Sequence, residues 1–242
     1  MDAGKIDTKK ALAAGTADAK EARAVLAAFK RLYPDPHHYL KFENPFQLLV
    51  ATILSAQCTD EKVNEVTAGL FREYPQPEDL AGEAVEAIER AVRPTGFYRN
   101  KAKAIKGASA AIVERFGGSV PATMEELLTL PGVARKSANA ILQHGFGKVE
   151  GVVVDTHVIR VAGRLGWTAN TDPEKIELDL MRLFDRKEWR WLPFYFKSHG
   201  RAVCKAPTPK CAECAVATLC PSALIEPQGT PRQKAPRRAA KT

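Results

Sequence analysis

The chain has 242 residues, 45% of them hydrophobic, and its 36 Lys and Arg against 28 Asp and Glu give a net charge of +8. No apolar run approaches the ~18 residues of a transmembrane helix, and the N-terminus lacks the apolar core of a secretory signal. We therefore expect a cytoplasmic chain that neither spans a membrane nor carries an export signal. Five basic residues and one acidic residue give residues 226–242 a net charge of +4. We predict disordered tails at 1–20 and 226–242, and the excess of positive charge favours a polyanionic partner.

Apolar residues recur at helical spacing through most of the chain. A first helix is predicted from Glu21 to Tyr33, and the pair Asn44-Pro45 predicts the start of a buried helix. Only Val152 to Val154 resembles a strand, which is too short to support a sheet. The predicted fold is all-α. The other predicted helices lie near residues 63–71, 80–92, 104–116, 123–130, 133–142, 158–161, 172–184 and 189–200.

Four of the five cysteines fall within 17 residues, with the spacing Cys204-x6-Cys211-x2-Cys214-x5-Cys220. Four thiolates in one short segment are ligands for zinc or for an iron–sulfur cluster. Structural zinc sites usually present two close cysteine pairs, and only one such pair occurs here. The uneven spacing favours a [4Fe–4S] cluster and leaves zinc open. Cys58 lies far away and is predicted to be a packing residue.

Two further segments carry candidate chemistry. Leu130 to Lys136 joins two predicted helices through Pro131-Gly132, a turn that leaves backbone N–H groups free for a phosphate or forms an ordinary helical hairpin. Making an ordinary lysine neutral at pH 7 costs about 4.6 kcal/mol, so a nucleophilic lysine here requires desolvation in a closed site. Asp155 precedes another helix and is predicted to be its N-cap, a role compatible with catalysis.

The ordered set of Leu54–Asp60, Leu130–Lys136, Val154–His157 and the four-cysteine loop closely resembles bacterial endonuclease III, a family in the helix-hairpin-helix superfamily of DNA glycosylases. The resemblance covers roughly residues 22–220. It implies two helical domains with a cleft between them. Residues 38–148 would form a six-helix domain with the helix-hairpin-helix, and residues 21–37 plus 149–225 a domain whose four cysteines hold a [4Fe–4S] cluster.

The resemblance also implies roles for individual residues. Lys136 matches the family nucleophile and Asp155 its essential carboxylate, whereas Gln57 matches the residue that fills the gap left by an extruded nucleotide. Phe97 matches a second intercalating position, where leucine is expected, and Ala134 stands where the family usually has glycine. The remaining predicted DNA contacts are Gly132, Val133, Ala134, Arg135 and His157.

These roles together predict a bifunctional DNA glycosylase/AP lyase of base excision repair. The enzyme would remove oxidised pyrimidines from double-stranded DNA, act on abasic sites, and cut the strand by β-elimination through a lysine Schiff base. We expect a monomer. Alternatives are a related glycosylase with a different base specificity and a non-catalytic iron–sulfur DNA-binding protein. A basic run is expected along the DNA backbone, comprising Arg93, Arg99, Lys101, Lys103 and Lys106.

Overall fold

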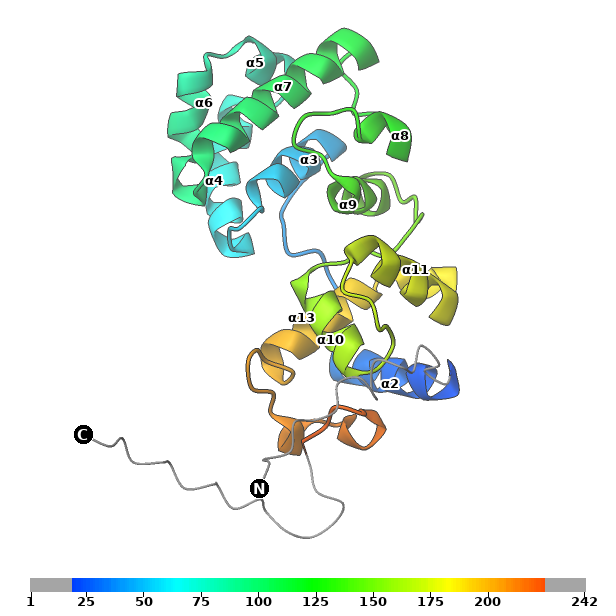
Figure 1. The fold of residues 1–242 in the computed structure, drawn as a ribbon. Coiled ribbons are helices and arrows are strands. Elements are labelled where there is room, and N and C mark those ends of the chain that lie inside the picture. The colour runs from blue at the N-terminus through cyan, green and yellow to red at the C-terminus, as the bar shows by residue number, and fades with distance from the viewer. Residues whose placement is uncertain (1–18, 225–242) are drawn as a thin grey trace, which may run out of the picture.

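The computed structural model describes residues 19–224, and within that range it is helical and contains no strand (Figure 1). The tail predicted at 226–242 lies outside the described residues. Residues 1–18 of the tail predicted at 1–20 also lie outside them. The helices are α2 (Ala19–Leu32), α3 (Pro45–Leu54), α4 (Asp60–Glu73), α5 (Pro77–Gly82), α6 (Val85–Val92), α7 (Tyr98–Phe116), α8 (Met124–Leu127), α9 (Arg135–Gly145), α10 (Thr156–Arg164), α11 (Pro173–Leu183), α12 (Arg186–Trp189) and α13 (Leu192–Ala202). Short 3₁₀ turns are η1 (Arg93–Thr95), η2 (Cys211–Glu213) and η3 (Ala217–Leu219).

The all-α prediction is confirmed, but several boundaries differ from the expected ones. The span predicted at 80–92 forms two helices, α5 and α6, and the span near 104–116 begins earlier, at Tyr98. The first turn of α7 is polar, so apolar spacing did not reveal it. The helix predicted from Val133 begins at Arg135, because Val133 lies in the hairpin turn. The tail predicted at 1–20 is too long by two residues, since α2 begins at Ala19.

Buried side chains form two separate hydrophobic cores. The first core contains residues from Leu40 to Leu142 and is built by α3 to α9, with α3 packed on α9 and α5 on α7. The second joins Ala22–Phe29 of α2 to residues between Val152 and Val216, with α10 packed on α13. In Figure 1 these cores form the upper and lower parts of the molecule. The chain passes from the second core to the first between residues 33 and 40, and back to the second between residues 146 and 152. These positions agree with the domain boundaries expected from the sequence, which stay a prediction.

Helix caps identified in the sequence fix the starts of key helices. The Asn44 side chain accepts the N–H of Gln47 at 2.9 Å, and Asp155 caps α10 by accepting two backbone N–H groups. The turn before α9 needs glycine at position 132, where φ is +78° and a Cβ atom would lie 2.8 Å from the Cβ of Ala104. The hairpin turn therefore packs closely on α7. None of the helices in residues 19–224 combines the length and apolarity needed to cross a bilayer.

Two carboxylates, Glu177 and Asp60, form ion pairs between the cores. Glu177 on α11 is 4% exposed, and its carboxylate accepts the Nε–H of Arg135 at 3.0 Å and the Nδ2–H of Asn139 at 2.9 Å. Asp60, the first residue of α4, accepts bonds from Lys197 at 2.5 Å and Arg201 at 3.1 Å on α13. Burial opposes ionisation of Asp60, but the bonds and charges of Lys197 and Arg201 lower its pKa overall.

The Asp60→Asn substitution should weaken the second of these contacts. An amide keeps the shape but loses the charge that two partly buried cations share, so we expect the free energy of unfolding at pH 7 to fall by about 1–3 kcal/mol. A carboxyl whose pKa is lowered in the folded state stabilises the fold fully at pH values above its ordinary pKa of 3.8. This stabilisation is lost as the pH falls from 3.8 through the lower pKa of the folded state. Urea unfolding at several pH values should therefore show the deficit at neutral pH and its decline below about pH 4.

Glu65→Gln is the matched control, because Glu65 is 66% exposed and pairs with Lys62 only within α4. We expect a change below about 0.5 kcal/mol. Equal effects of the two substitutions would show that the Asp60 contact adds no stability at the junction.

Candidate active site and cysteine cavity

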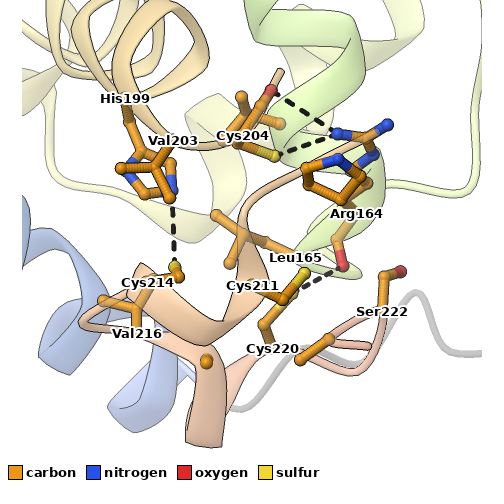
Figure 2. A pocket seen from close by; sticks show the side chains of 14 residues that line it. Arg164, Leu165, His199, Val203, Cys204, Cys211, Cys214, Val216, Cys220 and Ser222 are labelled. Atoms are coloured by element: carbon orange, nitrogen blue, oxygen red, sulfur yellow. Dashed lines mark hydrogen bonds between the residues drawn. The ribbon is translucent and has the colours of Figure 1, made fainter. Parts of the chain in front are cut away.

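The four clustered cysteines, which follow α13 in the chain, line one cavity (Figure 2). Leu165, Val203 and Val216 contribute apolar walls, and each thiol is partly buried. The Nη1–H of Arg164 donates to Cys204 Sγ at 3.3 Å, and His199 Nε2 lies 3.7 Å from Cys214 Sγ. Tyr33 bonds the other ring nitrogen of His199 at 3.1 Å. Both nitrogen groups are placed to donate to sulfur.

The donor set of this cavity suits a thiolate-bound metal group. Burial, followed by the charges of neighbouring cysteines, raises the pKa of Cys214, and the same causes raise the pKa of Cys220 to about 11. Four thiolates in one apolar cavity therefore need a cationic centre to neutralise them. In residues 19–224, no three His, Cys, Asp or Glu side chains converge closely enough to hold a single metal ion. Cys58 packs against the first core, away from these four.

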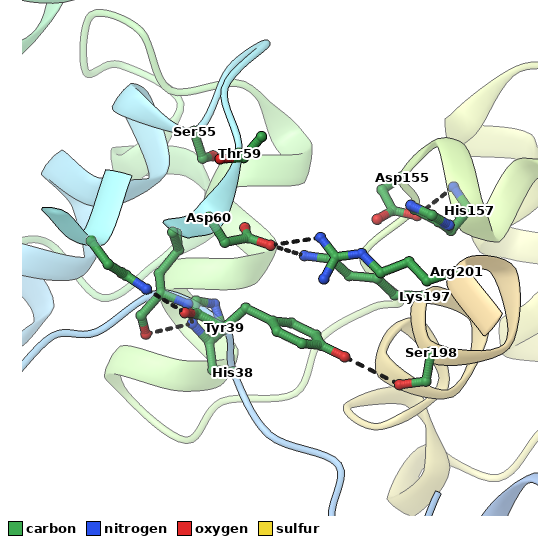
Figure 3. Close-up of polar contacts among 12 residues, drawn as sticks. His38, Tyr39, Ser55, Thr59, Asp60, Asp155, His157, Lys197, Ser198 and Arg201 are labelled. Atoms are coloured by element: carbon green, nitrogen blue, oxygen red, sulfur yellow. Dashed lines mark hydrogen bonds and ion pairs between the residues drawn. The ribbon is translucent and has the colours of Figure 1, made fainter. Parts of the chain in front are cut away.

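A second cavity, a cleft of about 540 Å³, opens between the two cores. Its volume falls within the ~300–1,000 Å³ typical of ligand sites. The first core contributes the loop before α4 and the start of α9, and the second contributes the start of α10 and one face of α13 (Figure 3). The cleft lining includes Gln57, Cys58, Asp60, Lys136, Asp155, His157, Lys197 and Arg201.

Lys136 and Asp155 therefore line the same cleft although they come from different cores. Lys136 is exposed on the first turn of α9. Asp155 is partly buried, and its Oδ1 accepts the N–H groups of His157 at 2.8 Å and Val158 at 2.9 Å. Within residues 19–224 no protein group bonds to Oδ2. The helix start thus holds a rigid carboxylate at the cleft, whereas the protein alone leaves the lysine in water.

The polar residues of the cleft are strongly interconnected. Figure 3 shows Asp60 facing Lys197 and Arg201 across the cleft. Lys197 Nζ lies 4.2 Å from the centre of the Tyr39 ring, a cation–π contact. Burial lowers the pKa of His157 against the opposing charge of Asp155, so the ring is neutral at pH 7. Its Nδ1 accepts from Arg160 at 3.1 Å.

Sequence reasoning missed Asp60, Lys197 and Arg201 as cleft residues. A signal for them existed: Asp60 follows Thr59, the N-cap of α4, and Lys197 and Arg201 are four residues apart on α13. That spacing puts both cations on one helix face. Pairing this face with Asp60 needs the tertiary fold, because the two elements are 137 residues apart in the chain.

Gln57 and Phe97 share an unusual backbone. Their φ angles are 51° and 50°, and they are the non-glycine residues with positive φ within residues 19–224. A left-handed conformation costs a non-glycine residue about 1–2 kcal/mol, and such strain concentrates at functional sites. Both side chains are exposed, Phe97 by 63%. The fold thus presents one polar and one aromatic side chain on two strained turns.

The predicted DNA contacts of the hairpin differ in their exposure. The Val133 N–H donates to Leu130 O at 3.1 Å and its side chain is buried, so neither faces outward. Arg135 is bound to Glu177 through Nε and is only partly exposed. Gly132 and Ala134 are exposed, and Ala134 has no side-chain group to cap the first N–H groups of α9. Those groups remain the candidate phosphate contacts.

The expected basic run is corrected at two positions. Lys101 is 5% exposed, and its ammonium donates to the carbonyl oxygens of Leu54 and Thr95. Lys106 donates to the carbonyl oxygens of Ala81 and Glu83. Both lysines therefore bind backbone carbonyl groups of the protein, Lys101 in a buried position and Lys106 in a partly buried one. The residues of this run that stay exposed are Arg93, Arg99 and Lys103.

Comparison with known proteins gives one consistent result. The family described as HhH-GPD superfamily base excision DNA repair protein matches residues 50–186. An endonuclease III of Synechocystis sp. is 54% identical over 204 residues, which cover 84% of this chain and 93% of the relative. Two solved structures, a non-covalent endonuclease III–DNA complex and a trapped endonuclease III–DNA covalent intermediate with an estranged adenine, each align with a TM-score of 0.81. Each is 39% identical and covers 85% of this chain and 96% of its own.

Proposed function

The chain belongs to the HhH-GPD superfamily of base excision DNA repair proteins and is a DNA glycosylase/AP lyase, and we propose that it excises oxidised pyrimidines with Lys136 as nucleophile. The observation that carries this proposal is that Lys136 and Asp155 line the same cleft between the two cores. A relative that is 39% identical has been trapped as a covalent DNA intermediate, which supports a nucleophile on the protein.

DNA is the partner, and its binding mode follows from the exposed groups. The uncapped first turn of α9 binds a phosphate through backbone N–H groups, and Arg93, Arg99 and Lys103 contact other phosphates. Phosphate contacts position the duplex and read no sequence. Gln57 and Phe97 enter the base stack, Gln57 replacing the extruded nucleotide, and the damaged base enters the cleft.

In the first chemical step the neutral amine of Lys136 attacks C1′ of the deoxyribose. The new C–N bond forms as the glycosidic bond breaks, and the base leaves with a proton. The negative carboxylate of Asp155 stabilises the positive charge that develops on the sugar. The start of α10 holds this carboxylate in a fixed position, so it needs no rearrangement during the reaction. Since Lys136 is exposed in the free protein, the bound DNA must supply the desolvation that makes the amine neutral.

The second step cuts the strand. Opening of the sugar leaves a Schiff base between Lys136 and C1′, which makes the C2′ proton acidic. Loss of that proton breaks the C3′–O bond by β-elimination and releases the downstream strand, which carries the phosphate at its 5′ end. Water then hydrolyses the Schiff base and frees the lysine. One residue thereby links base removal to strand cleavage.

Cys204, Cys211, Cys214 and Cys220 would hold a [4Fe–4S] cluster. Bound there, the cluster would supply a cationic centre that crosslinks four positions of the loop following α13. Arg164 and His199 donate to two of the sulfur atoms and orient them. We also infer that the chain acts as a monomer, because the proposed machinery lies within one chain, and that it resides with its DNA substrate in the cytoplasm.

Lys136→Ala should abolish covalent capture of DNA. Borohydride reduces a Schiff base to a stable amine, so the wild-type protein should form an adduct with duplexes containing an abasic site or an oxidised pyrimidine. The variant lacks the amine and should form none while it still binds DNA, which gel electrophoresis and a binding titration measure. The control Lys175→Ala removes an exposed lysine of α11 and should keep the adduct. An undiminished adduct with Lys136→Ala would refute the assignment.

Asp155→Asn separates the catalytic role of the carboxylate from its capping role. Asparagine caps a helix about as well as aspartate, so the free energy of unfolding should change little. Loss of the negative charge should lower single-turnover excision about 10²–10⁴-fold. An unfolded variant would indicate a purely structural N-cap, and unchanged excision would remove Asp155 from the mechanism.

Metal analysis tests the cofactor. The purified protein should contain iron and sulfide in the ratio of one [4Fe–4S] cluster, with broad visible absorbance. Cys214→Ser should lower both the iron content and the thermal stability, because the loop after α13 loses its crosslink. Cys58→Ser is the control and should keep the iron. Zinc without iron in the wild-type protein would overturn the assignment.

A further inference from the structure

One buried lysine connects the two strained turns that carry Gln57 and Phe97. The turn of Gln57 follows the last residue of α3, Leu54, and the turn of Phe97 follows the last residue of η1, Thr95. The ammonium of Lys101 donates to Leu54 O at 2.8 Å and to Thr95 O at 2.8 Å. Lys101 Nζ thus binds the residue that precedes each turn, although Leu54 and Thr95 are about 40 residues apart in the chain.

The surroundings of Lys101 exclude a direct contact with phosphate. Its side chain is 5% exposed, whereas Lys103 on the same helix is exposed. Burial lowers the pKa of Lys101 against the weaker opposing effect of Cys58. A buried cation is tolerated only where polar groups replace water, and the two carbonyls, at helix ends where the backbone is electronegative, provide that replacement. A methionine would fill this space without the cost of burying a charge.

We propose that Lys101 is a positioning residue that fixes the Gln57 turn relative to the Phe97 turn, so that both side chains enter the duplex together. This proposal rests on the wedge roles given to Gln57 and Phe97 in the proposed function. The backbone N–H of Lys101 also donates to Phe97 O at 3.2 Å, which ties the second turn to the same residue. Fixing the spacing of two inserted groups before DNA binds lowers the entropy lost on insertion.

Lys101→Met tests the proposal, with Lys175→Met, at an exposed lysine of α11, as the matched control. The substrate is a duplex with a tetrahydrofuran abasic analogue opposite 2-aminopurine, whose fluorescence rises when it unstacks. We expect Lys101→Met to slow the fluorescence rise about 10–100-fold, the effect of misplacing a group by about 1 Å. Lys175→Met should keep the wild-type rate at saturating protein. Borohydride capture of single-stranded abasic DNA needs Lys136 but no insertion, and should be unchanged in both variants.

A double-mutant cycle distinguishes positioning from a general loss of stability. Gln57→Ala and Phe97→Ala should each slow the rise in the wild-type background and add little in the Lys101→Met background, because the turns are already misplaced. Additive effects would overturn the positioning role, and so would a wild-type rate for Lys101→Met. Wild-type rates for both Gln57→Ala and Phe97→Ala would instead overturn the wedge roles in the proposed function, and the positioning role with them.

Lys101→Gln provides the second variant if Lys101→Met does not fold. Its amide is polar enough to be tolerated in place of the ammonium but too short to reach both carbonyls. We expect the same non-additivity with Gln57→Ala and a slowing smaller than that of Lys101→Met. A wild-type fluorescence rate for Lys101→Gln would overturn the proposal.

Discussion

The site depends first on the buried carboxylate of Glu177. Its two oxygens bind Arg135 and Asn139 of α9 from a position on α11, and so it joins the helix that carries Lys136 to the core that carries Asp155. Removing one partner of a buried, hydrogen-bonded charge leaves the other uncompensated, which is far more costly than the contact is stabilising. The cores can therefore separate only with difficulty on this side. The cleft keeps its width because this contact and the Asp60 contact lie on different helices.

Charged residues inside the cleft are paired with one another, whereas several basic residues outside it are exposed. Inside, Asp60 forms ion pairs with both Lys197 and Arg201, and burial lowers the pKa of His157. Arg93, Arg99 and Lys103 do not line the cleft and are exposed. A phosphate backbone is consequently attracted to these exposed cations, whereas Asp60, Lys197 and Arg201 in the cleft are already paired with one another. The net charge of +8 thus says less about DNA binding than the exposure of each basic residue does.

The sequence predicts those parts of the site whose structure depends only on residues a few positions apart in the chain. Asp155 was identified as an N-cap because capping depends on residues two and three positions away, and the Pro131-Gly132 turn was identified from the conformation that only glycine adopts easily. The roles of Lys101 and Glu177 depend on partners more than 35 residues away. A basic run looks the same in sequence whether its lysines face solvent or carbonyl oxygens, which is why Lys101 and Lys106 were misassigned.

In the proposed mechanism the cleft directs a single amine, that of Lys136, to the sugar. Lys197 also lines the cleft and is the competing amine. The most direct measurement is mass-spectrometric mapping of the wild-type protein after borohydride reduction with abasic DNA and proteolysis. We expect the sugar remnant on the peptide containing Lys136. A remnant on Lys197 or another amine would refute the role of Lys136 as the nucleophile.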